Sequence, residues 1–268
     1  MSSHSTVEKS ALGLPRPLDE WIGDAPLYEH SGLSGAQTLF VDRDAGAYLK
    51  IAPRGTLARA ALLQKYWAGR ALSAAVLMYL SEDRDYLVTA PVPDRDGTAA
   101  EHLARPERLC EVFGQSLRQL HGMDFSDCPV DQLGELLARV PGAPASPSTG
   151  ATFEQWLLDD LRPFIGEASA ESAAAEIRAG EGLLRRDALV HGDYCLPNIL
   201  LDGWKRTGFI DVAEGGVGDR HWDIIWGLWT IHHNLKKTEY GEQFLDAYGR
   251  DAVDKDRLRI CALLAAME

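Results

Sequence analysis

Short hydrophobic segments separated by glycine-rich turns dominate the first third of the chain. We predict strands at four places in it: residues 38–42, 47–51, 75–79 and 85–90. Residues 56–69, between the second and third of these, are rich in Ala and Leu and favour a helix. Residues 1–20 lack such a pattern and are interpreted as a loose leader. The pattern therefore predicts a small, antiparallel, mostly β lobe over residues 21–95.

The pattern changes to helical periodicity after residue 97. Residues 106–121 place five hydrophobic side chains on one helical face: Leu109, Val112, Phe113, Leu117 and Leu120. Further helices are predicted at 153–164, 172–184 and over most of 223–268, and short strands at 199–201 and 208–210. Residues 141–149 are rich in Pro, Ser, Gly and Ala and predict a loop. We expect an α+β fold with a larger, mostly helical C-terminal lobe over 96–268 and a ligand cleft between the lobes.

The net charge of the chain limits the kinds of molecule that it is expected to bind. The formal net charge is −13, with 40 acidic against 27 basic residues, which argues against nucleic acid or an anionic membrane as partner. It is compatible with a small cationic ligand. The four cysteines show no metal-binding spacing, and the N-terminus has no apolar signal segment. We expect a cytoplasmic protein with reduced thiols, as a monomer or weak dimer.

The candidate chemistry lies in residues 191–198, which read HGDYCLPN, and in the sequence FID that ends at Asp211. Phosphoryl transfer requires a group that positions the acceptor hydroxyl and oxygen ligands that hold magnesium. In the kinase template an Asp on a loop is the base, and an Asn five residues later and a second Asp bind the metal. Each residue alone also suits an ordinary turn or cap. The ordered set within 21 residues favours a kinase.

These motifs, followed by Gly216, Asp219 and Asp223, resemble the aminoglycoside 3'-phosphotransferases of the protein-kinase-like superfamily. The resemblance extends from about residue 28 to the end and is most specific over 191–223. It implies a bilobal fold, ATP and Mg²⁺ as cofactors, and phosphoryl transfer to a hydroxyl of an aminoglycoside antibiotic, which confers resistance. It also implies that Asp193 is the catalytic base and that Asn198 and Asp211 bind magnesium. His191 is expected to brace the loop.

The resemblance assigns nucleotide contacts to the N-terminal lobe. Lys50, on the predicted strand 47–51, corresponds to the lysine that contacts the phosphates. Ser34 falls in the short loop that positions the nucleotide. Residues 89–92 correspond to the hinge between the lobes, where backbone groups of Ala90 and Val92 bind adenine. Val92 supplies the N–H because Pro91 has none.

Three departures from the family pattern affect this assignment. The glutamate that pairs with the lysine is replaced by Ala60, and residues 55–69 contain no acid. The usual Asp-x-Gly-Arg reads Asp-Val-Ala-Glu over 211–214. The acidic pair expected after Asp223 is replaced by His232 and His233, which we interpret as structural, and the C-terminus lacks its acidic and aromatic finish.

Acceptor binding is assigned to acids on the helix predicted at 153–164. Glu154 and Asp160 are the candidates, because a cationic sugar requires carboxylates. Two alternatives stay open. The acceptor is another small alcohol, such as a macrolide, a sugar or an amino alcohol, or the protein is a nucleotide-binding pseudokinase, which only the missing glutamate supports.

Overall fold

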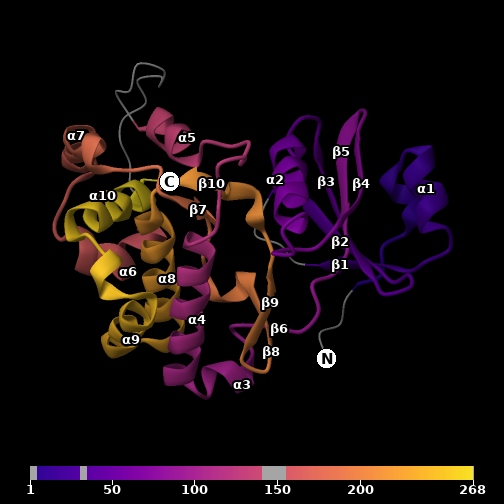
Figure 1. Cartoon of the computed structure of the whole chain (residues 1–268). Coiled ribbons are helices and arrows are strands. Elements are labelled where there is room, and N and C mark those ends of the chain that lie inside the picture. Colours follow the sequence, from indigo (N-terminus) through magenta and orange to yellow (C-terminus); the bar gives the residue numbers. More distant parts are fainter. Residues whose placement is uncertain (1–4, 31–34, 141–154, 268) are drawn as a thin grey trace. The chain divides into compact units, whose positions relative to one another are not determined.

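The computed structural model describes residues 5–30, 35–140 and 155–267, with the backbone alone for 155–159. The chain divides into two compact units (Figure 1). The first contains Met1–Pro93 and Gly208–Ala213, and the second contains Asp94–Thr207 and Glu214–Glu268. The chain thus returns to the first unit for the six residues that include Asp211.

The first unit is built on an antiparallel sheet with strand order β1-β2-β3-β5-β4. Its strands are β1 (Leu27–His30), β2 (Gln37–Val41), β3 (Ala47–Pro53), β4 (Val76–Ser81) and β5 (Arg84–Thr89). Its helices are α1 (Arg16–Ile22) and α2 (Ala58–Ala68), with a 3-10 turn at Lys9–Leu12. Each strand and the helix predicted at 56–69 are present, with ends shifted by up to two residues.

One face of this sheet packs against the N-terminal segment. Leu49 and Ile51 of β3 share a buried cluster with Leu18 and Ile22 of α1. Leu18 is fully buried, which requires α1 to lie against the sheet. The expectation of a loose leader over residues 1–20 was therefore wrong from residue 6 onward, because Thr6 pairs with Tyr28 of β1, and Leu12 and Leu18 are buried in this cluster.

The other face of the sheet packs against α2. Side chains alternate along a strand, so Lys50 and Ala52 of β3 point to the face opposite Leu49. Lys50 lies opposite Leu87 of β5, and Ala52 and Leu87 form a buried cluster with Ala61 of α2. Sequence alternation thus places Lys50 on the face that α2 covers.

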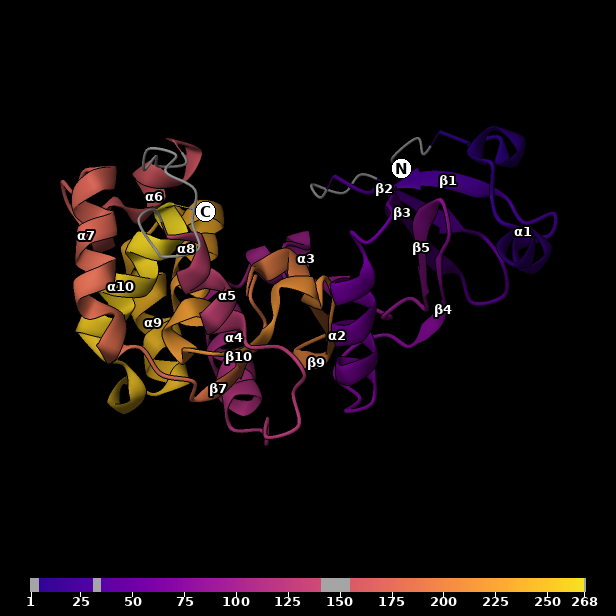
Figure 2. The ribbon, with the colours of Figure 1, turned by 90° about the horizontal axis from the view of Figure 1, so that it is seen from above.

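The second unit is mostly helical. Its helices are α3 (Ala100–Leu103), α4 (Pro106–His121), α5 (Gln132–Arg139), α6 (Gln155–Ile165), α7 (Ala170–Gly180), α8 (Arg220–Leu235), α9 (Thr238–Tyr248) and α10 (Lys255–Ala266). Its short strands are β6 (Arg95–Asp96), β7 (Ala188–Val190), β8 (Ile199–Asp202), β9 (Lys205–Phe209, whose last two residues belong to the first unit) and β10 (Gly216–Gly218). In Figure 2, α7 and α10 lie side by side at the edge of this helical group.

Close helix packing in this unit depends on small residues. A Cβ at Gly114 of α4 would lie 2.5 Å from the carbonyl oxygen of Phe244 in α9. Only glycine therefore lets α4 and α9 approach at this point. The helix predicted at 106–121 is confirmed, and most of 223–268 is helical as predicted, with interruptions at 236–237 and between Tyr248 and Lys255. The loop predicted at 141–149 lies outside the described residues.

Two other expectations concern the whole chain. All four cysteines are free thiols, as the sequence predicts. Among the described residues, no helix combines the length and the hydrophobicity that a membrane crossing requires.

Candidate active site

The loop that follows β7 is held through its backbone by one buried carboxylate. Asp223, in the first turn of α8, accepts the His191 N–H at Oδ2 (2.7 Å) and the Gly192 N–H at Oδ1 (2.9 Å). The side chain of Asp223 is completely buried. Both carboxylate oxygens are thus used to fix the loop immediately before Asp193.

Gly192 is required by the shape of this loop. Its φ is +89°, in the left-handed region that favours glycine, and a Cβ there would lie 2.0 Å from the carbonyl oxygen of Glu214. Its own carbonyl oxygen accepts a hydrogen bond from Trp222 Nε1 at 2.7 Å. The structure thus gives a direct reason for glycine at position 192.

Asp193 and Asn198 are brought together by the turn between them. The Asn198 side-chain amide donates to Asp193 Oδ2 at 2.7 Å and to the Asp193 carbonyl oxygen at 3.0 Å. The Asp193 N–H donates to His191 Nδ1 at 3.3 Å, which fits the expected bracing role of His191. Because the Asn198 nitrogen is engaged in this way, its amide oxygen is the atom that can bind a metal.

Behind the loop, a buried relay that we did not single out from the sequence supports Asp223. His121, the last residue of α4, contacts Asp223 Oδ2 through Nε2 (3.1 Å) and the Tyr248 hydroxyl through Nδ1 (2.9 Å). These residues come from three helices, so their contact is a product of tertiary packing. The only signal in the sequence is that His121 ends the hydrophobic face of a predicted helix.

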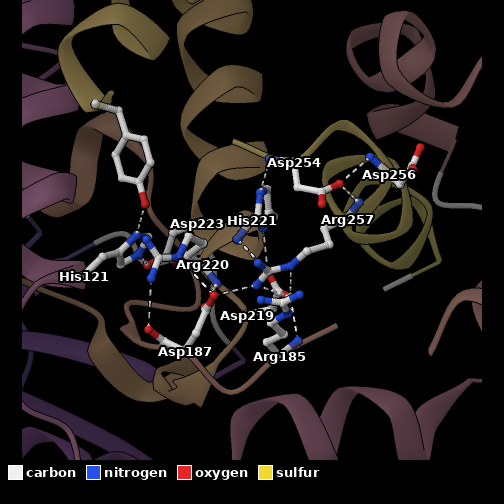
Figure 3. A network of polar contacts seen from close by, with 11 residues as sticks. His121, Arg185, Asp187, Asp219, Arg220, His221, Asp223, Asp254, Asp256 and Arg257 are labelled. Carbon is white, nitrogen blue, oxygen red and sulfur yellow. Dashed lines mark hydrogen bonds and ion pairs between the residues drawn. The ribbon is translucent and has the colours of Figure 1, made fainter. Parts of the chain in front are cut away.

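A second polar network fixes the N-terminus of α8, which carries Asp223 (Figure 3). Asp219 caps the helix by accepting from the His221 N–H at 2.9 Å, and its other oxygen accepts from Arg257 Nε at 2.9 Å. Arg257 also binds Asp187 at 2.7 Å. Burial by itself would raise the pKa of Asp219, but the hydrogen bonds from the His221 side chain and backbone outweigh it, and the pKa is lowered.

In the first unit, Lys50 is paired with Asp211. The Lys50 Nζ lies 2.5 Å from Asp211 Oδ1. The segment that carries Asp211 is attached to this unit by Phe209, whose N–H donates to the Leu72 carbonyl (2.8 Å) and whose carbonyl accepts from Ser73 Oγ (2.7 Å). Asp211 has a φ of +53°, in the left-handed region that residues other than glycine seldom adopt.

This ion pair replaces the one that the kinase pattern predicts. Ala60 is partly buried in the cluster of Ala52, Leu57, Ala61 and Leu87, on the sheet face to which Lys50 points. Helix α2 offers no carboxylate there, and Lys50 takes the carboxylate of Asp211 instead. Two residues assigned to the site from the sequence are thus in direct contact.

Residues 89–92, which we expected to form the hinge, make contacts within the first unit. The Ala90 N–H donates to the Ala75 carbonyl at 2.9 Å. The side chain of Val92 lies against Gly208, where a Cβ would be 2.9 Å from Val92 Cγ1. Ser34 and Glu154 lie outside the described residues.

Asp160, assigned to acceptor binding, is in contact with the two histidines that we interpreted as structural. Its Oδ1 lies 2.9 Å from His232 Nδ1, and its Oδ2 lies 3.1 Å from His233 Nδ1. Burial would raise the pKa of Asp160, but the hydrogen bonds from His233 and His232 outweigh this effect and lower it. Asp160 is therefore ionised near neutral pH.

The oxygen donors in these motifs are typical of a magnesium site that is completed by phosphates and water, and not of a metal site built from protein side chains alone. In the part of the chain that the structure describes, no three His, Cys, Asp or Glu side chains form a metal-binding group. Magnesium in kinases is held by one or two protein oxygens together with phosphates and water. The amide oxygen of Asn198 and the carboxylate of Asp211 are donors of that kind.

Comparisons with known proteins agree with this chemistry. The sequence model of the phosphotransferase enzyme family matches residues 30–261. A probable aminoglycoside 3'-phosphotransferase from Lactococcus lactis subsp. lactis is 39% identical over 248 residues, which are 92% of each chain. The aminoglycoside 3'-phosphotransferase of Niallia circulans is 28% identical over 94% of this chain and 97% of its own.

Solved structures give the same result for the fold. An aminoglycoside 3'-phosphotransferase of type VIII superposes with a TM-score of 0.69 at 23% identity, covering 94% of this chain and 97% of its own. An aminoglycoside phosphotransferase from Streptomyces rimosus superposes with a TM-score of 0.66 at 25% identity, covering 93% and 95%. The expected α+β kinase-like fold class is confirmed. The resemblance read from the motifs is confirmed as well, and this chain belongs to the phosphotransferase enzyme family.

Proposed function

We propose that this protein transfers the γ-phosphoryl group of ATP to a hydroxyl of an aminoglycoside, in the manner of the 3'-phosphotransferases. The observation that carries the proposal is the loop in which Asn198 binds one oxygen of Asp193 while Asp223 holds the preceding backbone. The relatives named above, and the Streptomyces rimosus enzyme, whose structure was solved with ADP and streptomycin, support the choice of nucleotide and acceptor.

Asp193 acts as the base in this proposal. Its Oδ2 is held by Asn198, so Oδ1 is the oxygen that accepts the proton of the acceptor hydroxyl. The deprotonated oxygen forms the new bond to the γ-phosphorus as the bond from that phosphorus to the β,γ-bridging oxygen breaks. ADP leaves, and the proton stays on Asp193. The fixed geometry of the carboxylate reduces the reorganisation needed at this step.

The nucleotide contacts are assigned residue by residue. Asn198 and Asp211 bind Mg²⁺, which neutralises charge on the phosphates. Lys50 binds the α- and β-phosphates, and Ser34, in the short loop that positions the nucleotide, also contacts the phosphates. The carbonyl of Ala90 and the N–H of Val92 bind adenine. In this proposal the nucleotide-binding lobe expected over residues 21–95, with its hinge at 89–92, is extended by α1 and by residues 208–213, and the rest of 96–268 is the catalytic and substrate-binding lobe.

The acceptor is bound in this proposal through acidic residues, Glu154 and Asp160, which suit an acceptor with several ammonium groups. An acidic protein with a net charge of −13 also favours capture of such a cation. We place the reaction in the cytoplasm, with the protein as a monomer or weak dimer and without nucleic acid or membrane as partner.

Turnover of ATP over a panel of acceptors tests the proposal. Kanamycin and neomycin should be phosphorylated, and KM should rise with salt because the contacts are ionic. Asn198→Ala and Asp211→Ala should each move the midpoint of a magnesium titration of nucleotide binding upward. Absence of phosphorylation of any aminoglycoside at any salt concentration would reject the acceptor, and unchanged magnesium midpoints would reject the two ligands.

A second candidate, a kinase of another small alcohol, keeps the same chemistry. The observation that favours it is that both oxygens of Asp160 are already engaged by His232 and His233. Macrolides, sugars and amino alcohols in the same panel would identify such an acceptor. A pseudokinase is disfavoured, because it has no use for a complete set of Asp193, Asn198 and Asp211.

A further inference from the structure

A chain of hydrogen bonds joins helix α2 to the segment that carries Asp211. The Gln64 side-chain amide donates to Ser73 Oγ at 2.8 Å and to the Ala74 carbonyl oxygen at 2.6 Å. Ser73 Oγ in turn lies 2.7 Å from the Phe209 carbonyl oxygen. All of these residues belong to the first unit, so the chain of hydrogen bonds lies within one compact part of the molecule.

The direction of each hydrogen bond follows from the chemistry of its groups. A carbonyl oxygen only accepts, so the Gln64 atom that contacts the Ala74 carbonyl is the amide nitrogen. For the same reason the Ser73 hydroxyl donates its hydrogen to the Phe209 carbonyl and accepts from Gln64. This arrangement requires an amide at position 64, because a carboxylate has no hydrogen to donate to the Ala74 carbonyl.

The same region holds Phe209 at two further points. The Phe209 N–H donates to the Leu72 carbonyl at 2.8 Å, and its ring meets Trp67 edge to face, with centroids 5.7 Å apart and planes inclined by 88°. Trp67 and Gln64 are three residues apart, which places them on one face of α2. Gln64, Trp67 and Phe209 are all buried. The backbone and the ring of Phe209 are thus fixed by α2 and by the residues that follow it.

This attachment matters because Lys50 cannot hold Asp211 while the metal is bound. In the proposed reaction Lys50 leaves Asp211 to bind phosphate, and the Asp211 carboxylate binds magnesium. The Asp211 side chain is 51% exposed, so its position then depends on the backbone that carries it. Phe209, two residues earlier, fixes that backbone to the first unit.

We propose that Gln64 and Ser73 are positioning residues for Asp211, which hold the Phe209 carbonyl so that the carboxylate stays in place for magnesium when Lys50 leaves it. Helix α2 has no acidic residue, and it acts on Asp211 through Phe209 instead of through an ion pair with Lys50. This inference rests on the proposed function, in which Asp211 is a magnesium ligand.

The first test compares Ser73→Ala, which removes the hydroxyl, with Ser73→Thr, which keeps it. ATP binding is titrated with magnesium, and the apparent affinity falls with the fraction of protein whose ligand is in place. The midpoint should rise up to about fivefold in Ser73→Ala, which corresponds to about 1 kcal/mol, the usual net value of one hydrogen bond. Ser73→Thr should stay near wild type. The kcat of Ser73→Ala should return to the wild-type value at saturating magnesium, which general damage to the fold would not allow.

The second test changes the donor. The carboxylate of Gln64→Glu accepts the Ser73 hydrogen and takes it from Phe209, so this variant should raise the midpoint as Ser73→Ala does. Gln64→Glu should add little in the Ser73→Ala background, because both changes act through one hydrogen bond. The matched control is Gln115→Glu, which adds the same charge at an exposed position of α4 and should leave the midpoint unchanged.

A third measurement needs neither metal nor turnover. Amide hydrogen exchange of residues 208–213, in the protein without nucleotide and magnesium, should be faster in Ser73→Ala and Gln64→Glu than in wild type and Ser73→Thr. Exchange in α4 should be the same in all four proteins, which shows that they are folded. Unchanged exchange in residues 208–213 of both variants would overturn the inference.

The magnesium titration separates this inference from the proposed function. A midpoint that shifts in Asp211→Ala but not in Ser73→Ala would overturn the inference alone. A midpoint that does not shift in Asp211→Ala would reject Asp211 as a ligand in the proposed function and the inference with it. The expected shifts in Ser73→Ala, without phosphorylation of any aminoglycoside, would reject the proposed acceptor and support the inference.

Discussion

Lys50 and Asp211 form an ion pair with 2.5 Å between Nζ and Oδ1, although they lie 161 residues apart in the sequence. The kinase pattern instead leads to the expectation that a glutamate of the following helix holds the lysine, and α2 has no acidic residue. Both side chains are partly exposed, at 29% and 51%, so the pair can open at moderate cost. In the proposed reaction this ion pair opens, and Lys50 then binds phosphate while Asp211 binds magnesium.

A glutamate at position 60 should therefore raise kcat/KM for ATP. Ala60→Glu places a carboxylate on the sheet face to which Lys50 points and offers Lys50 a second partner. Asp211 is then released for magnesium, and kcat/KM for ATP should rise about tenfold, which corresponds to about 1.4 kcal/mol. Steady-state kinetics with ATP as the varied substrate measure the change.

The control for this variant is a Lys50→Ala background, in which the gain should vanish because the two residues act as a pair. An equal gain in both backgrounds would show that Ala60 does not correspond to the glutamate. Absence of a gain in either would show that Asp211 already serves Lys50 fully, or that the reaction does not use Lys50.

The sequence predicted the fold well where local patterns were strong. The strands around Lys50 alternate clearly, and the helix at 106–121 has five hydrophobic residues on one face. The sequence did not predict helix α1, because its burial depends on a sheet whose strands come later in the chain. The strands β1, β6, β7 and β10 were not predicted, because these segments of two to four residues have no clear alternation of hydrophobic and polar positions and are fixed by pairing with distant strands.

The site could be predicted only as a set of residue types. The order and spacing of Asp193, Asn198 and Asp211 within 21 residues made them candidates, and the family resemblance supplied the role that we propose for each. The relay from Tyr248 through His121 to Asp223 and the contact of Asp160 with two histidines join distant segments. No local pattern encodes such contacts, so only the structure could supply them.

Asp223→Asn should impair catalysis without touching the nucleotide. An asparagine has one acceptor oxygen in place of two, so either the His191 or the Gly192 N–H loses its partner. We expect kcat to fall at least about tenfold and the free energy of unfolding to fall by about 2 kcal/mol, the cost of an unsatisfied buried group. Kinetics and urea unfolding measure both effects, with the KM for ATP unchanged.

Tyr248→Phe is the milder comparison, because it removes only the hydroxyl that binds His121. Its effect on kcat should be smaller than that of Asp223→Asn. A kcat of Asp223→Asn equal to that of wild type would show that Asp193 does not depend on this support.

Asp219 should make stability sensitive to acid. Its pKa is lowered from 3.8 in the folded protein, so its contribution to stability is complete above about pH 4 and is lost as pH falls through the folded pKa. Asp219→Asn leaves Arg257 with a weakened buried ion pair and should lower the free energy of unfolding by about 3 kcal/mol at neutral pH. The difference from wild type should shrink below pH 4, as urea unfolding at several pH values would measure.

The control for Asp219 is Asp246→Asn, because the Arg250 hydrogen bond also lowers the pKa of Asp246 but at a fully exposed site. Its effect on unfolding should be far smaller at every pH. A difference between wild type and Asp219→Asn that stays constant with pH would contradict the assigned ion pair.

The role of Asp193 as base is tested most directly by the turnover of kanamycin in the Asp193→Ala variant, at saturating ATP and magnesium. We expect kcat to fall at least about 100-fold, because general base catalysis contributes 10²–10⁴ in rate. The affinity for the nucleotide, measured by titration of the same protein, should change little, since Asp193 is assigned to the acceptor. A variant that keeps near-normal turnover would contradict the assignment of Asp193 as the base.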